Sequence, residues 1–318
     1  MVKSLISLAV LGTLATPAVY AAETTKTEMK EESKWTLTTN MGFVSDYRAR
    51  GVSQTWRKAA VQGGLDLTHD SGFYAGAFGS NVTPHTYPQA NVELDLYAGY
   101  NGTVAAVEGL GYTVGVIGYF YPGGSWKKYT GYVDGPNVQQ TPNGGRWDTY
   151  EANAGISYKW LSAKASVTLG DWYGAERKTG WTKSTRGTTY LELNAAIPTP
   201  LDGLTLIGHV GRLDVNGELD PNFTTNVESG TSEYPSSSLS GATKPDYTDY
   251  KVGLSYAFKV LNADGWNAGL YYIGNNNDNY WGSRGYGGTS FNGAGSTSVA
   301  ESKNLNRDAA VFTLDRTF

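Results

Sequence analysis

The sequence predicts an all-β fold, a transmembrane antiparallel up-and-down β-barrel of about twelve strands with long extracellular loops and short periplasmic turns. Three observations indicate this class. Apolar residues alternate with period two along most of the 318-residue chain, and the connections between these segments alternate between short and long. The composition is rich in Gly (41), Tyr (23) and Trp (9), with only 17% charged residues, which favours strands and turns.

Composition also excludes two classes of protein. The chain lacks an apolar run of the roughly 20 residues that a spanning helix requires, so a helical membrane protein is excluded. The net charge is −4, whereas a nucleic-acid-binding protein needs a basic stripe. We therefore expect no nucleic-acid partner.

The first residues predict export. Lys3 supplies a positive start, an apolar stretch runs from Leu5 to Leu14, and small residues end at Ala21. This pattern is typical of a secretory signal peptide over residues 1–21. The charged stretch 22–34 is predicted to be a disordered periplasmic lead-in, and 35–318 to form the barrel. The chain contains no Cys, which excludes a lipoprotein anchor and disulfide bonds.

Twelve segments carry the alternation, and we expect each to belong to a strand of about the 9–11 residues that a tilted strand needs to cross a membrane. In order along the chain they lie at 35–43, 61–67, 73–82, 92–100, 112–116, 150–158, 163–169, 191–197, 204–206, 250–258, 266–272 and 310–314. The inward face of the third segment stays open, because both of its faces carry an aromatic residue.

The connections distinguish a membrane barrel from a soluble sandwich. After even-numbered strands they are short, at 69–72, 159–160, 198–203 and 259–265, with 101–111 the longest of this set. After odd-numbered strands most are long, at 122–146, 170–187, 214–249 and 275–308. Short turns at one rim and long loops at the other are typical of an outer-membrane barrel whose turns face the periplasm.

Aromatic residues stand at predicted strand ends, where an interfacial belt would place them. They are Tyr100, Tyr121, Tyr158, Trp160, Trp172, Tyr250 and Trp266. A closed sheet also pairs every backbone group within the chain, as lipid requires.

The first third of the mature chain resembles the TorF family of porins. The segments that carry the resemblance are Trp35–Thr55 (WTLTTNMGFVSDYRARGVSQT), Ala60–Leu67, Ser71–Gly76, Ser80–Val82, Glu93–Tyr100 and Tyr119–Pro122. The resemblance implies an outer-membrane location and a pore, without a defined substrate. The chain departs from the family pattern at Phe78, at Ala59–Ala60 and at Arg316, and its loops after Asp214 and Asn275 are longer than is typical.

If one face of each strand meets lipid, the charged residues should line the lumen, because Lys or Arg facing lipid costs roughly 2–4 kcal/mol near the midplane. The candidate pore-lining residues are Asp46, Arg48, Arg50, Glu93, Asp95, Glu151, Lys164, Glu192 and Lys251, and the same phase sends Asp66, Asn153 and Asp315 inward. Carboxylates outnumber cations on this face, so we predict a mild preference for cations.

The segment Asp46-Tyr-Arg-Ala-Arg50 follows the first strand. If the strand phase continues, Asp46, Arg48 and Arg50 point inward at the outer mouth. The two guanidinium groups could grip an anionic solute, or they could brace the wall through ion pairs to Glu93 or Asp95. Both interpretations stay open, with bracing favoured.

Two further features have less specific interpretations. Residues Asn275–Asn279 could ligate a hard cation, but without the spacing of a calcium loop a solvated loop is favoured. The chain has three His, at 69, 85 and 209, and lacks G-x-S-x-G, Walker and metal-binding His motifs. We therefore expect neither an enzyme nor a cofactor or metal site.

Two functions from different classes remain. The first is a porin that allows passive diffusion of small hydrophilic solutes or ions. The second is a non-conducting barrel whose long outer loops bind a surface ligand or partner; an outer-membrane lipid enzyme ranks below both. The expected partners are outer-membrane lipid and lipopolysaccharide, the small hydrophilic solutes, and the barrel-insertion machinery, which would engage the C-terminal strand ending at Phe318.

Overall fold

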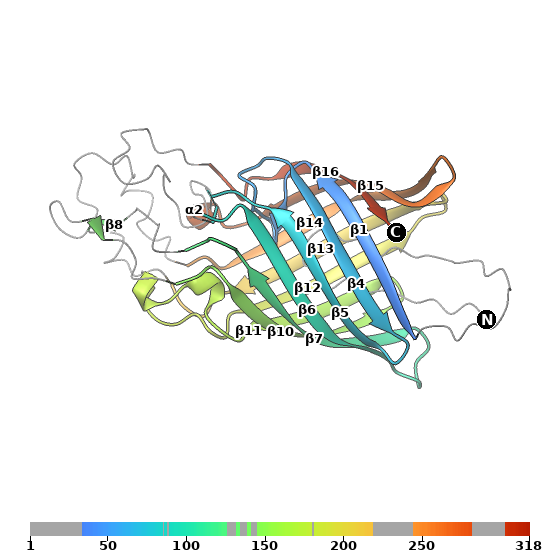
Figure 1. Cartoon of the computed structure of the whole chain (residues 1–318), viewed down its shortest axis with the longest axis horizontal. Helices are drawn as coiled ribbons and strands as arrows, with labels where there is room; N and C mark the ends of the chain where they lie inside the picture. Colours follow the sequence, from blue (N-terminus) through green and yellow to red (C-terminus); the bar gives the residue numbers. More distant parts are fainter. Residues whose placement is uncertain are drawn as a thin grey trace.

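The computed structural model is a closed antiparallel β-barrel (Figure 1). It describes residues 34–84, 86–87, 89–125, 132–133, 139–140, 145–179, 181–218, 244–281 and 303–318. Twelve strands form the barrel, in the order β1-β16-β15-β14-β13-β12-β11-β10-β7-β6-β5-β4, and β4 pairs with β1 to close it. The predicted fold class is confirmed. The predicted signal peptide and nearly all of the lead-in lie outside the described residues.

The barrel strands are between 8 and 14 residues long. Their bounds are β1 Trp35–Val44, β4 Ala60–His69, β5 Phe73–Asn81, β6 Val92–Thr103, β7 Leu110–Phe120, β10 Thr149–Tyr158, β11 Leu161–Thr168, β12 Thr189–Pro198, β13 Leu204–Asp214, β14 Tyr247–Val260, β15 Ala263–Asn275 and β16 Ala309–Thr317. Two short hairpins lie outside the barrel sheet, β2 Arg48–Ala49 with β3 Val52–Ser53, and β8 Tyr132–Val133 with β9 Gln139–Gln140. The described helical turns are η2 Trp172–Gly174, η3 Arg177–Thr179 and α2 Asp278–Trp281.

The connections follow the predicted rhythm. Short turns at 70–72, 104–109, 159–160, 199–203 and 261–262 lie at one rim, and longer connections leave the other. The 104–109 turn is shorter than predicted because β6 and β7 each extend further than the sequence pattern indicated. The C-terminus lies toward the short-turn rim and α2 lies at the opposite end (Figure 1).

The outer surface of the barrel is apolar. One cross-strand row joins outward side chains of four adjacent strands, Leu206 with Leu254, Leu254 with Leu270, and Leu270 with Phe312. All four are exposed, between 40% and 59%. Apolar area left in contact with water would be strongly unfavourable, so this surface requires an apolar surrounding.

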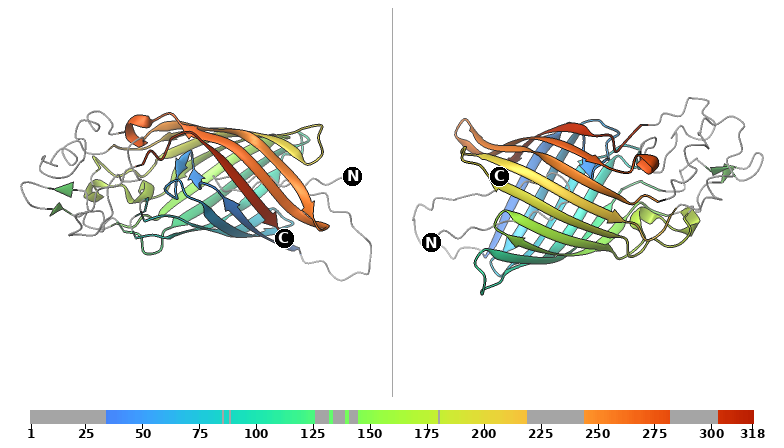
Figure 2. Two further views of the ribbon diagram at one scale, coloured as in Figure 1. Left: turned by 90° about the horizontal axis from the view of Figure 1, so that it is seen from above. Right: turned by 180° about the vertical axis from the view of Figure 1, so that it is seen from behind.

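The structure shows which face of β5 points into the barrel, a choice that the sequence did not decide. On β5, Tyr74 and Phe78 are buried inside the barrel, whereas Phe73 is 58% exposed on the outside. The strands are inclined around the whole wall (Figure 2). Among the described residues, no helix is long and apolar enough to cross a membrane.

Candidate functional site in the barrel lumen

Residues 45–59, which connect β1 to β4, fold into the outer mouth of the barrel, and we name this segment the insert. Its centre is the β2–β3 hairpin, whose two-residue turn is Arg50-Gly51. Arg50 has φ 48° and Gly51 has φ 80°. Positive φ at both central positions is what a type I′ hairpin turn requires, and glycine favours it.

Hydrogen bonds join the insert to β15 and to the connection that precedes β16. The Arg48 guanidinium pairs with Asp46 at 2.7 Å and donates to the carbonyls of Gly51 and Ile273. The backbone N–H of Ser53 donates to Leu305 O at 2.9 Å. The prediction that Asp46, Arg48 and Arg50 continue the phase of the first strand is therefore wrong, because β1 ends at Val44 and the chain turns into the lumen.

Arg50 reaches across the mouth to the barrel wall. It donates two hydrogen bonds to Glu151 on β10, with Nη1–Oε1 2.9 Å and Nη2–Oε2 2.7 Å. Its guanidinium lies over the Tyr190 ring of β12, 4.2 Å from the ring centre. Burial alone lowers the pKa of Arg50, but the Glu151 carboxylate more than offsets this, so the pKa lies well above its usual value. This ion pair braces the insert against β10.

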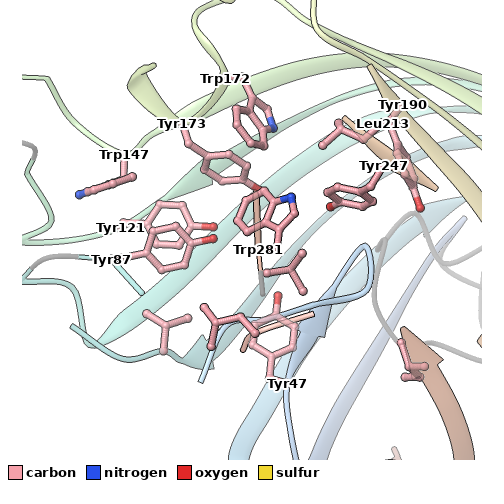
Figure 3. Packing of buried hydrophobic residues seen from close by; sticks show 14 of the residues in the cluster. Tyr47, Tyr87, Tyr121, Trp147, Trp172, Tyr173, Tyr190, Leu213, Tyr247 and Trp281 are labelled. Carbon is pink, nitrogen blue, oxygen red and sulfur yellow. The ribbon is translucent and has the colours of Figure 1, made fainter. Parts of the chain in front are cut away.

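A cluster of buried side chains, most of them aromatic, lies at the mouth beside the insert (Figure 3), and we name it the aromatic cluster. Tyr87 and Tyr121 are stacked with ring centres 4.0 Å apart. Trp172 of η2 contacts Trp281 of α2 edge to face at 6.4 Å. Other members are Tyr47, Trp147, Tyr173, Tyr190, Leu213 and Tyr247, all of them buried. Side chains from the connections and from the outer ends of β12, β13 and β14 therefore gather at the mouth.

Two residues assigned to the interfacial belt belong to this cluster instead. Tyr121 is 1% exposed and Trp172 is 3% exposed, and both point inward. Tyr121 keeps the inward parity of Ile117 and Tyr119 on β7. Tyr158 and Trp160, by contrast, are each 44% exposed at the short-turn rim, as a belt requires.

The lumen wall formed by β11–β14 has partnered charges. Lys164 Nζ lies 2.6 Å from Glu192 Oε1. His209 lies 2.9 Å from Asp249 and 2.6 Å from Asn194 Oδ1, and the Tyr190 hydroxyl donates to Asp249 at 3.0 Å. The remaining cation of this wall, Lys251, lies 5.3 Å from the centre of the Tyr271 ring. Two lysines thus face two carboxylates, and the wall is close to electroneutral.

The opposite wall, formed by β4–β10, is acidic. Glu93 and Asp95 on β6 are each 2% exposed. Among the described residues, Glu93 Oε2 and Asp95 Oδ1 find no hydrogen-bond partner. Asp66 accepts a hydrogen bond from the Tyr97 hydroxyl at 2.6 Å. Within the described residues, Tyr47 and Tyr121 donate hydrogen bonds to Glu93, and the one ion pair of this wall is that of Glu151 with Arg50.

All nine predicted pore-lining residues lie on the inner side of the barrel or in its mouth, and their role in permeation stays a prediction. The structure brings Arg50 together with Glu151, and Lys164 with Glu192. It does not bring Arg48 or Arg50 into an ion pair with Glu93 or Asp95 among the described residues. Sequence reasoning missed Asp249 as the partner of His209, and it missed the hairpin, for which the glycine at position 51 was the available signal.

The close fit of the insert at Gly51 gives a first prediction. A Cβ at this position would lie 2.8 Å from both Asp249 Cβ and Gly274 O, at a φ that disfavours side chains. We expect Gly51→Val to displace the insert and lower the free energy of unfolding by roughly 2–3 kcal/mol. The channel current through the barrel should rise. Denaturant titration and bilayer recording measure the two effects.

Gly170→Val is the matched control, because a Cβ on Gly170 meets no atom within 4 Å. It should change the free energy of unfolding by no more than about 0.5 kcal/mol. Equal stabilities for the two variants would contradict the tight seating of the insert.

The expectation of neither an enzyme nor a metal site stays a prediction, and two features of the described part of the chain bear on it. There, no group of three or more His, Asp or Glu is arranged to hold a metal ion. The hydrogen-bond partners of His209 are Tyr190, Asn194 and Asp249, not a serine. The predicted loop segment 275–279 lies within the described chain, where it runs from the last residue of β15 to the first two residues of α2, whereas 282–302 lies outside it.

Comparison with known families identifies the chain. A family model described as "Bacterial protein of unknown function (Gcw_chp)" matches residues 28–240, more than half of the chain. The chain belongs to the Gcw_chp family. The resemblance to the TorF family stays a prediction. No curated protein matches the Gcw_chp chain.

Several solved structures are similar to this Gcw_chp protein at low identity. The KdgM porin is 8% identical, with a TM-score of 0.42 over 88% of this chain and 98% of that one. The NanC porin is 10% identical, with a TM-score of 0.41 over 89% and 99% of the two chains. OccD3 (OpdP) of Pseudomonas aeruginosa is 9% identical, with a TM-score of 0.35 over 91% and 66%.

Proposed function

We propose that this protein is a channel of the Gram-negative outer membrane, through whose lumen small hydrophilic solutes or ions diffuse passively. The observation that carries the proposal is the segregation of side chains by the closed barrel. Leucine and aromatic side chains cover its outside, while carboxylates, lysines and amides line its inside. A polar interior inside an apolar cylinder is the arrangement of a membrane channel.

The rest of the proposal follows from the same location. A signal peptide over 1–21 directs the chain to the periplasm, and the C-terminal strand engages the barrel-insertion machinery. Lipid and lipopolysaccharide then surround the outer surface. The insert and the aromatic cluster narrow the outer mouth, so we expect a small conductance.

The test is single-channel recording in planar bilayers with the purified, refolded protein. Discrete current steps are expected with the folded barrel, and none with detergent alone or with heat-unfolded protein. A folded preparation that inserts without current steps would contradict the channel. It would favour the second candidate, a closed barrel whose outer loops bind a surface ligand, which the buried aromatic cluster at the mouth supports.

A further inference from the structure

We propose that the β5–β10 side of the lumen is a cation-binding wall, with Glu93, Asp95 and Asn153 as its oxygen ligands. This inference rests on the proposed channel and names the class of solute that it takes, which is small inorganic or ammonium-type cations.

Two carboxylates of this wall lie on β6. Glu93 and Asp95 alternate along one strand and face the same side, both almost completely buried. The cross-strand neighbours of Asp95 are Phe78 on β5 and Tyr119 on β7. An ionised carboxylate beside an aromatic neighbour is costly to bury unless a positive charge compensates it.

The charges around Asp95 are mainly negative. The charged groups that act on Asp95 are Glu93 and Glu151, and both repel its negative charge. Arg50, a cation of the insert, is engaged by Glu151 through two hydrogen bonds. Compensation for Glu93 and Asp95 is therefore expected from a mobile cation, which carboxylate oxygens bind well.

The third oxygen ligand, Asn153, does not belong to the acidic pair. Asn153 on β10 is 8% exposed and faces the lumen, one inward position below Glu151. Its Oδ1 finds no hydrogen-bond partner among the described residues. A buried amide oxygen without a partner is costly, and it is also an uncharged ligand for hard cations. Oxygen ligands therefore continue along this wall beyond the carboxylates.

The β11–β14 wall differs from the acidic wall in how its charges are paired. There Lys164, Glu192 and Asp249 are engaged by side chains of the same wall. The charges on that side of the lumen therefore pair with one another between neighbouring strands. On the acidic side, Tyr47 and Tyr121 donate hydrogen bonds to Glu93, but within the described part of the chain no Lys or Arg forms an ion pair with Glu93 or Asp95. We infer that a cation moves along this side.

The experiment is the reversal potential of single channels between 10-fold different KCl concentrations, at low salt to limit screening. We expect the wild type to prefer K⁺ over Cl⁻. Asp95→Asn should reduce the K⁺/Cl⁻ permeability ratio roughly threefold, and Glu93→Gln with Asp95→Asn about tenfold. Asn153→Ala, which leaves the charge unchanged, should reduce it roughly threefold.

Asp315→Asn is the matched control, because Asp315 also points inward but lies on β16, outside this wall. It removes the same charge and should leave the ratio nearly unchanged. Anion preference of the wild type, or equal effects of Asp95→Asn and Asp315→Asn, would overturn the cation-binding wall while leaving the channel intact. A folded protein without current would instead overturn the channel, so the two failures are distinguishable. Because amides replace uncompensated buried carboxylates, the variants should remain folded.

Discussion

Arg50→Ala should destabilise the protein by about 3–5 kcal/mol, the usual cost of removing one partner of a buried ion pair. The substitution leaves Glu151, which is 2% exposed, without the two hydrogen bonds that Arg50 donates. It also removes the cation over the Tyr190 ring. Equilibrium unfolding in urea, followed by tryptophan fluorescence of the detergent-solubilised barrel, measures the loss.

Two further variants show whether the cost comes from the uncompensated carboxylate. Arg50→Ala combined with Glu151→Gln removes both charges and should recover a large part of the stability. Arg212→Ala breaks an exposed pair with Asp214, in which both side chains are about half exposed, and should cost no more than about 1 kcal/mol. If Arg50→Ala proves as mild as Arg212→Ala, the bracing role of Arg50 is wrong.

The same variant bears on the two interpretations of the Asp46–Arg50 segment. Arg48 is engaged by Asp46 and backbone carbonyls, and Arg50 by Glu151. Both guanidinium groups are engaged by groups of the chain itself, which favours bracing. We expect current through Arg50→Ala to increase, because the insert loses an attachment to the wall. Lower current would instead indicate that Arg50 draws a solute into the mouth.

The barrel itself could be predicted because its signals are local. Alternation with period two, turn residues and the unequal connections can each be read within short windows of the chain, and all twelve strands follow from them. The inward side chains of Glu93, Asp95 and Glu151 follow from the same parity.

The insert could not be predicted in this way, because Asp46, Arg48 and Arg50 alternate like the strand before them. What ends β1 is non-local: Ser45 exchanges hydrogen bonds with Phe312 on β16, 2.9 Å in each direction. The partner of Arg50 likewise lies 101 positions away along the chain. The alternation along a strand thus predicts whether a side chain points inward or outward, but it does not predict which groups that side chain contacts inside the lumen.

Leu254→Arg should be the most informative substitution on the outer surface. Leu254 is 47% exposed in the middle of β14, within the outward row that contains Leu206 and Leu270. In a membrane, an arginine at this position faces hydrocarbon and costs roughly 2–4 kcal/mol. We expect this loss in the free energy of unfolding measured in lipid vesicles, together with slower insertion.

Leu261→Arg provides the same change of side chain at the end of the same hairpin. Leu261 is 97% exposed in the turn between β14 and β15, where an arginine reaches water or lipid headgroups and costs about 0–1 kcal/mol. The difference between the two variants isolates contact with hydrocarbon from the change in composition. If both variants unfold at the same urea concentration, the apolar outer surface does not face lipid, and the channel proposal loses its physical basis.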